Sequence, residues 1–82
     1  MQKKFAQKLN EHNEQTGELL DLVKELMDTS ETQIKNGNTE LAEHVANIAE
    51  RLANIVGEIT ETFEEEHDEE LELLKKMLAN KQ

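Results

Sequence analysis

Residues 41–63 read LAEHVANIAERLANIVGEITETF and carry the widest apolar surface of the chain. At the helical step of about 100° per residue, the large apolar side chains fall on one side and small side chains form a second ridge beside them. The large set is Leu41, Val45, Ile48, Leu52, Ile55, Val56, Ile59 and Phe63, and the small set is Ala42, Ala46, Ala49, Ala53 and Gly57. Together they cover roughly 200° of the helix, whereas a helix packed on one partner needs about 100°. This helix is therefore expected to contact at least two others.

The preceding residues predict a second helix and a tight turn. Over residues 2–35, seam-forming side chains recur at alternating spacings of four and three, which is typical of a packed helix. They are Phe5, Leu9, His12, Thr16, Leu19, Val23, Leu26 and Ser30. Gly37 can take the left-handed conformation that ends a helix, and a short connection makes an antiparallel hairpin. Because residues 29–32 have low helix propensity, a kink there is an alternative to a straight helix.

Counting both arms from Gly37 sets the expected register of the hairpin. It places Leu26 near Ile48, Leu19 near Ile55, and His12 near Thr62 and Phe63.

No clear stop signal follows the turn until Asn80, so the second helix is expected to run from about 39 to 80, or ~63 Å. It would overhang the first helix and leave its last apolar residues without an intrachain partner. The alternative is a short third helix that folds back from about His67, although no glycine or proline marks that turn. Residues 1–82 are thus predicted to form one all-α domain, an antiparallel hairpin with helices at about 2–35 and 39–80 and a turn at 36–38.

The wide apolar surface and the overhang both predict self-association. Two hairpins that dimerise into a four-helix bundle or coiled coil would bury both features. The predicted oligomer interface is Ala42, Val45, Ala46, Ala49, Leu52, Ala53, Val56, Ile59, Phe63, Leu71, Leu74 and Leu78. In this interpretation the alanines let the second copy approach closely; alternatively, the small-residue groove accepts a helix of a different protein.

Composition narrows the function classes. The chain has 82 residues, no cysteine and no proline, and a net charge of −10. No apolar run approaches the ~18 residues of a membrane span and no signal peptide is evident, so the expected location is the cytoplasm of a bacterium, or of an infected host cell if the chain is phage-encoded. The charge disfavours direct binding to nucleic acid or to an anionic membrane and is compatible with a basic protein partner. Nothing indicates nucleophilic catalysis or a phosphate-binding loop, so we expect a non-enzymatic protein without a cofactor.

An acidic block is the strongest compositional anomaly. Residues 58–72 hold nine acidic side chains and no basic one. Along a continuous helix this block approaches the charge density of duplex DNA, about one charge per 1.7 Å. The predicted partner-binding face is Glu58, Glu61, Glu64, Glu65, Asp68, Glu69 and Glu72. It predicts a regulator or inhibitor of a protein partner, for example a nucleic-acid-binding protein engaged by DNA mimicry; the alternative is a merely solvated face.

Two further interpretations stay open. Weak candidate metal ligands are His12, Glu64, Glu66, His67 and Glu70. The Glu64-x-x-His67 spacing resembles that of ferritin-like carboxylate proteins over these four residues, and the resemblance implies a metal-binding helical bundle. The other interpretation is a purely structural oligomerisation module. In type, the short acidic cysteine-free chain is similar to small regulators and phage-encoded inhibitors.

Overall fold

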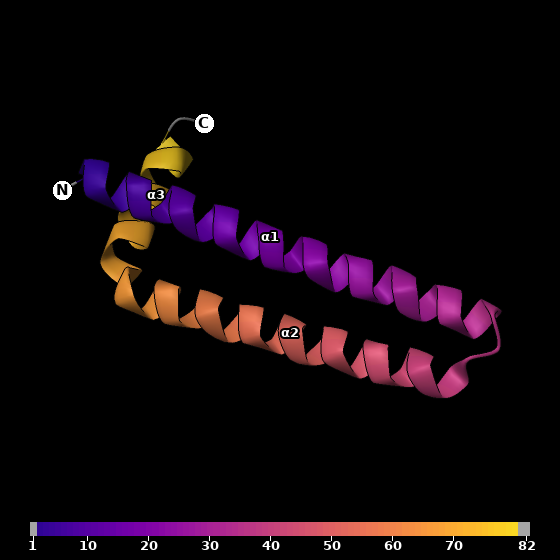
Figure 1. Cartoon of the computed structure of the whole chain (residues 1–82). Coiled ribbons are helices and arrows are strands. Elements are labelled where there is room, and N and C mark those ends of the chain that lie inside the picture. The colour runs from indigo at the N-terminus through magenta and orange to yellow at the C-terminus, as the bar shows by residue number, and fades with distance from the viewer. Residues whose placement is uncertain (1, 81–82) are drawn as a thin grey trace.

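The computed structural model describes residues 2–80, which form three helices: α1 (Gln2–Lys35), α2 (Thr39–Glu66) and α3 (Asp68–Asn80). α1 and α2 lie antiparallel along their whole length, and α3 crosses the open end of this hairpin beside the start of α1 (Figure 1). The molecule measures 53 × 26 × 16 Å. One helix has a Cα cylinder about 4.6 Å across, so the 16 Å depth includes α3, which lies on one face of the hairpin. The predicted all-α hairpin is confirmed, and most of it is a single layer of two helices.

The turn at Gly37 forms as the sequence predicts. Gly37 has φ of 83° and donates its N–H to the carbonyl of Ile34 at 3.0 Å, while the N–H of Asn38 reaches the carbonyl of Gln33 at 2.8 Å. These two bonds satisfy carbonyls that the end of α1 would otherwise leave free. The carbonyl of Asn38 then accepts the N–H of Ala42 at 3.0 Å and begins α2.

Small side chains form the seam between α1 and α2. Ala42, Ala49 and Val56 are 1%, 0% and 6% exposed, and Ser30 of α1 is 5% exposed. The Ser30 hydroxyl donates a hydrogen bond to the carbonyl oxygen of Ala42 at 2.7 Å. This contact between the two helices requires a small side chain at both positions. Ala42, Ala49 and Val56, which the sequence assigned to an oligomer interface, are thus occupied by the contact within the hairpin.

The register matches the expectation, but the inward face of α2 is rotated. The rings of His12 and Phe63 stack with centroids 4.2 Å apart, as the count from Gly37 predicted. Ile48 and Ile55, expected opposite Leu26 and Leu19, are exposed, because their neighbours Ala49 and Val56 face α1 instead.

The prediction of one helix over 39–80 is wrong, and the alternative of a third helix is confirmed. His67 ends α2 by donating its N–H to the carbonyl of Phe63 at 3.1 Å, and its own carbonyl accepts the N–H of Leu71 at 3.0 Å to begin α3. In one continuous helix, all the acidic residues of this region would lie in the middle of the helix, far from its N-terminus. The break instead puts Asp68, Glu69 and Glu70 in the first turn of α3, where the helix dipole favours negative charge.

α1 does not break at residues 29–32. The hydroxyls of Thr29 and Thr32 donate to the carbonyls of Glu25 and Asp28 at 2.9 and 3.0 Å. The third hydroxyl of this stretch, that of Ser30, is directed across the seam. The residues with low helix propensity are thus held by α2 and by the preceding turn of their own helix.

The Ser30→Ala variant should lower the free energy of unfolding by about 1 kcal/mol, because a buried hydrogen bond between the helices is lost. Thr29→Ala is the matched control: its hydroxyl is exposed and alanine favours helix, so stability should stay within a few tenths of a kcal/mol of wild type. Urea denaturation at one protein concentration measures both. Equal stability of S30A and wild type would contradict the role assigned to the seam bond.

Candidate interaction surfaces

One face of the hairpin is bare and apolar. We call it the isoleucine face, and its residues are Leu22, Leu41, Ile48, Ile55 and Ile59. All five side chains are more than a third exposed. Two antiparallel helices are related by a two-fold axis perpendicular to the plane that contains them. This axis exchanges the helices but not the two faces of the plane, so residues at equivalent positions relative to the seam lie on the same face. Leu22 directly precedes the half-buried Val23, and Leu41, Ile48 and Ile55 each precede a buried residue of α2, so the four share one face.

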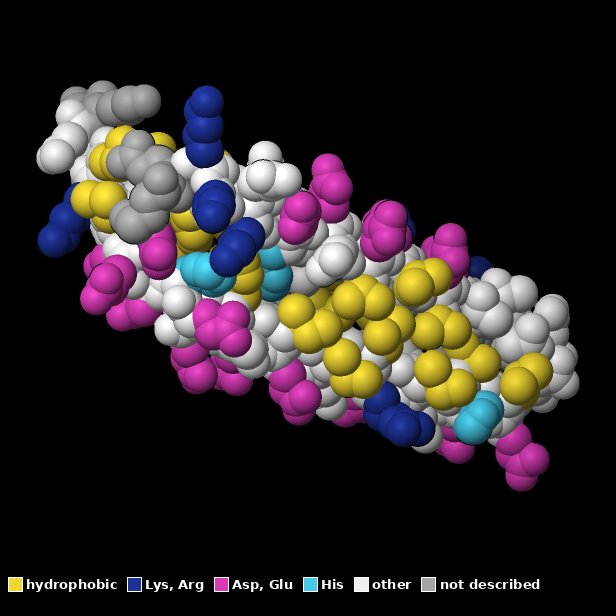
Figure 2. Space-filling model, turned by 60° about the vertical axis from the view of Figure 1, so that its left-hand side comes forward, with side chains coloured by type: hydrophobic (Ala, Val, Ile, Leu, Met, Phe, Trp, Pro, Cys, Tyr) yellow, Lys and Arg dark blue, Asp and Glu magenta, His cyan; other side chains and the backbone are white. Residues whose placement is uncertain are grey.

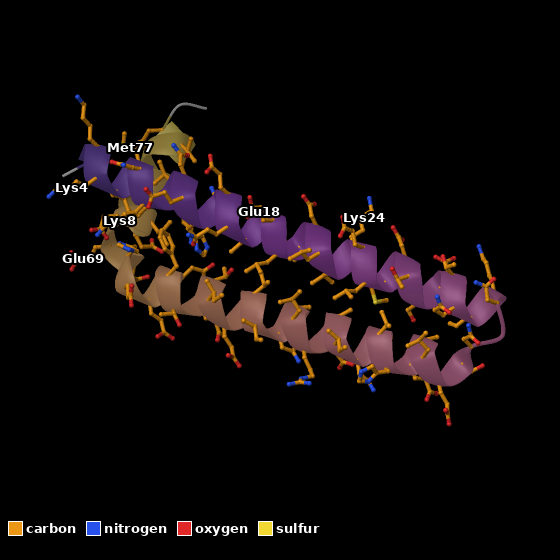
Figure 3. All side chains as sticks on the ribbon, in the orientation of Figure 1. Lys4, Lys8, Glu18, Lys24, Glu69 and Met77 are labelled. Atoms are coloured by element: carbon orange, nitrogen blue, oxygen red, sulfur yellow. The ribbon has the colours of Figure 1, made fainter. Side chains whose placement is uncertain are left out.

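The two edges of this face differ in charge: the α1 edge is acidic, whereas the α2 edge is mixed, because Glu58 follows Arg51 two turns further along the same row. On α2, Arg51 lies one helical turn from both Ile48 and Ile55, and His44 has the same relation to Leu41 and Ile48. On α1, Glu18 and Glu25 lie one turn before and after Leu22. Figure 2 shows the hydrophobic strip with acidic side chains along one side and a basic side chain, a histidine and further acidic side chains along the other. Glu18 is labelled midway along α1 in Figure 3.

The opposite face of the hairpin is partly covered by α3. Every seventh residue of α1 along this face is Ala6, Asn13, Leu20, Met27 and Ile34. Ala6 and Asn13 line hollows together with residues of α3. The three larger side chains further along the row are exposed. α3 therefore covers the open end of this face and leaves its turn end bare.

An aromatic cluster joins the three helices. Besides the His12 stack, the ring of Phe63 lies 4.5 Å from that of His67 and 6.4 Å from that of Phe5. The rings of Phe5 and His67 are 5.5 Å apart. Phe5 and Phe63 are the only aromatic residues of the chain besides its histidines. This cluster was not predicted from the sequence, although the register from Gly37 already brought His12 to Phe63.

α3 supplies apolar side chains to the start of α1. Leu73, Leu74 and Met77 line a cavity of about 220 Å³ with Phe5, Ala6, Leu9 and Glu70. Leu71 and Leu74 are half-buried. The expectation that the last apolar residues lack an intrachain partner is therefore wrong for Leu71 and Leu74. Leu78 remains 58% exposed.

The break at His67 divides the predicted acidic face. Glu58, Glu61, Glu64 and Glu65 lie on α2, and Asp68, Glu69 and Glu72 lie on α3, all of them exposed. Four of these carboxylates, those of Glu61, Glu64, Glu65 and Asp68, surround an open hollow. Glu69 is labelled beside the bend in Figure 3. We call these seven residues the acidic corner, because their charges turn with the chain and do not follow one straight line like the phosphates of a duplex.

The candidate metal ligands are not gathered into a site. His67 lies 3.9 Å from Glu70, measured from Nδ1 to Oε2, and His12 is stacked on Phe63. Glu64 and Glu66 are exposed. Across the part of the chain that the structure describes, no group of three or more His, Asp or Glu side chains is placed to hold a metal ion.

Comparison with protein-family models, with curated proteins and with solved structures finds no match for this chain. Among the described residues, no helix has both the length and the apolar character needed to cross a membrane.

Phe5→Ala should release α3 from the hairpin, because the ring contacts His67 and lines the cavity below α3. Amide hydrogen exchange in residues 71–80 should accelerate about tenfold, while the amides of the seam near Ser30 keep their protection. Leu78→Ala, which removes an exposed side chain of α3, is the control and should leave these exchange rates within about twofold. Unchanged exchange in α3 of F5A would contradict the docking described above.

Proposed function

We propose that this chain is a non-enzymatic helical interaction protein that dimerises through its hairpin and regulates or inhibits a protein partner. The observation that carries the proposal is the thin fold: long aliphatic side chains line both faces of a single helix layer and stay about half exposed. Such a layer is typical of a protein that completes its core by association.

The sizes of the apolar side chains support this. Inside the described hairpin, the buried apolar residues are two alanines and a valine. Complete burial of a leucine or isoleucine is worth roughly 1.5–3 kcal/mol, and about half of that is still to be gained at each half-exposed position. The five residues of the isoleucine face thus offer more hydrophobic free energy than the buried part of the seam. Association into a four-helix bundle would use it.

The acidic corner is the proposed recognition surface for the partner. Its seven carboxylates are exposed and gathered at one end of the molecule, away from the turn. A surface of this kind attracts a basic patch over a distance set by the ionic strength, about 10 Å at 0.1 M salt. A nucleic-acid-binding protein has such a patch and is the proposed class of target. A chain without cysteine suits a reducing compartment, so the cytoplasm is the proposed place of action.

Reversing three charges of the corner, in Glu61→Lys, Glu65→Lys and Glu69→Lys combined, should abolish capture of a basic partner and leave helicity unchanged. The matched control is Glu14→Lys, Asp21→Lys and Asp28→Lys, which alters net charge equally on the outer side of α1. Tagged protein incubated with extract of the native host at ~0.1 M and ~0.5 M salt, followed by mass spectrometry, gives the readout.

The proposal is supported if wild type captures a basic protein at low salt but not at high salt, and if the corner variant fails to capture it while the control variant still does. Equal capture by both variants would show that the corner only keeps the protein soluble. Recovery of the chain alone at both salt concentrations would favour a purely structural oligomerisation module.

A further inference from the structure

We infer that the isoleucine face is the contact between two copies of this chain, related by a two-fold axis that runs parallel to the helices. In this arrangement α1 of each copy lies over α2 of the other, and Arg51 lies between Glu18 and Glu25 of the second copy. The inference rests on the proposed dimerisation and assigns its face, its symmetry and its ion pairs.

The choice of face follows from the position of α3. α3 stands over Ala6 and Asn13 on the opposite face of the hairpin, so a flat second hairpin cannot dock along the full length of that face. The isoleucine face carries no such obstruction between Leu41 and Ile59. It is also continuous with half-buried seam residues such as Leu26 and Leu52, which a second copy would cover further.

The choice of symmetry follows from the charged edges. Two hairpins that stack face to face can share a two-fold axis either parallel or perpendicular to the helices. The perpendicular axis places α1 over α1, so the edge with Glu18 and Glu25 would meet its own copy, and the edge with Arg51 would do the same. The parallel axis places α1 over α2, so each acidic α1 edge meets an α2 edge in which Arg51 offsets the charge of Glu58. Like charges in contact are costly, so the edges select the parallel axis.

The register of the hairpin determines which charged residues of the two copies meet. Contacts of Ser30 with Ala42 and of His12 with Phe63 define which residues of α1 and α2 lie at the same height in the hairpin. Interpolation between these pairs puts Arg51 at the height of Leu22. A two-fold axis parallel to the helices leaves heights unchanged, so Arg51 of one copy meets the α1 edge of the other at Leu22. Glu18 and Glu25 flank that position by about one helical turn, or ~5.4 Å, on either side.

The same symmetry brings the two acidic corners to one end of the dimer. Their repulsion opposes association, but these carboxylates are exposed and screened by salt over about 10 Å. The ion pairs at the edges of the interface are in direct contact and lose less to screening. A basic partner would then meet twice the number of carboxylates at a single end.

The available area fits a specific dimer of modest affinity. From Leu41 to Ile59 the face is roughly 27 Å long, and two helices side by side are roughly 20 Å wide. Contact over this rectangle removes on the order of 1,000 Å² in total from water, which is the lower limit for specific protein interfaces.

Sedimentation equilibrium of the purified chain should give a dimer of the 9.4 kDa protomer. Ile55→Asp should dissociate it, whereas Met27→Asp, on the opposite face, should not. The two side chains are matched, at 49% and 50% exposure, and circular dichroism checks the helicity of both variants. A monomeric wild type would overturn the proposed dimerisation itself. A dimer that resists I55D and is broken by M27D would overturn only the assigned face.

Charge exchange tests the symmetry. Arg51→Glu should raise the dissociation constant of the dimer about tenfold, and adding Glu18→Arg and Glu25→Arg to the same chain should restore it to within about threefold of wild type. The control adds Glu14→Arg and Asp21→Arg to R51E, which changes net charge equally but away from the face, and should restore less. Equal restoration by the two sets would contradict the parallel two-fold axis.

Discussion

The close contact of α1 and α2 at small side chains determines both the register of the hairpin and the residues that stay exposed. Ser30 reaches the carbonyl of Ala42 at 2.7 Å, and Ala49 is fully buried opposite α1. Because these small residues face inward, the large aliphatic residues beside them are rotated to the outside. The hairpin therefore gains a defined register from its seam but leaves much of its apolar surface in contact with water.

The open end of the hairpin shows how charge and apolar contact together place a helix boundary. The acidic residues after His67 favour the start of a new helix. Because the chain folds back there, leucines of α3 line a cavity together with Phe5 and Leu9. The aromatic cluster of Phe5, His12, Phe63 and His67 fixes this bend. The same bend turns the acidic block into a corner, so its negative charge gathers at one end.

The helical hairpin, the turn at Gly37 and the register of His12 with Phe63 were predictable from the sequence, because spacing and turn chemistry are local signals. Two features were not. The choice of Ala49 over Ile48 as the inward residue depends on how closely two helices approach, and side-chain spacing alone allows both. The bend at His67 has no glycine or proline; its available signal was the run of acids at the start of α3, which the prediction treated only as a surface charge.

In the proposed dimer Ile48 is covered by a second copy, whereas Ala49 is covered by α1 of its own chain. The chain has no cysteine, so Ile48→Cys, Ala49→Cys and Glu50→Cys each carry a single thiol, whose rate of alkylation can be followed as protein concentration rises. We expect I48C to react readily in dilute solution and to become protected on concentration, A49C to be protected throughout, and E50C to react throughout. An I48C rate independent of concentration, or an A49C rate as high as that of E50C, would contradict this arrangement.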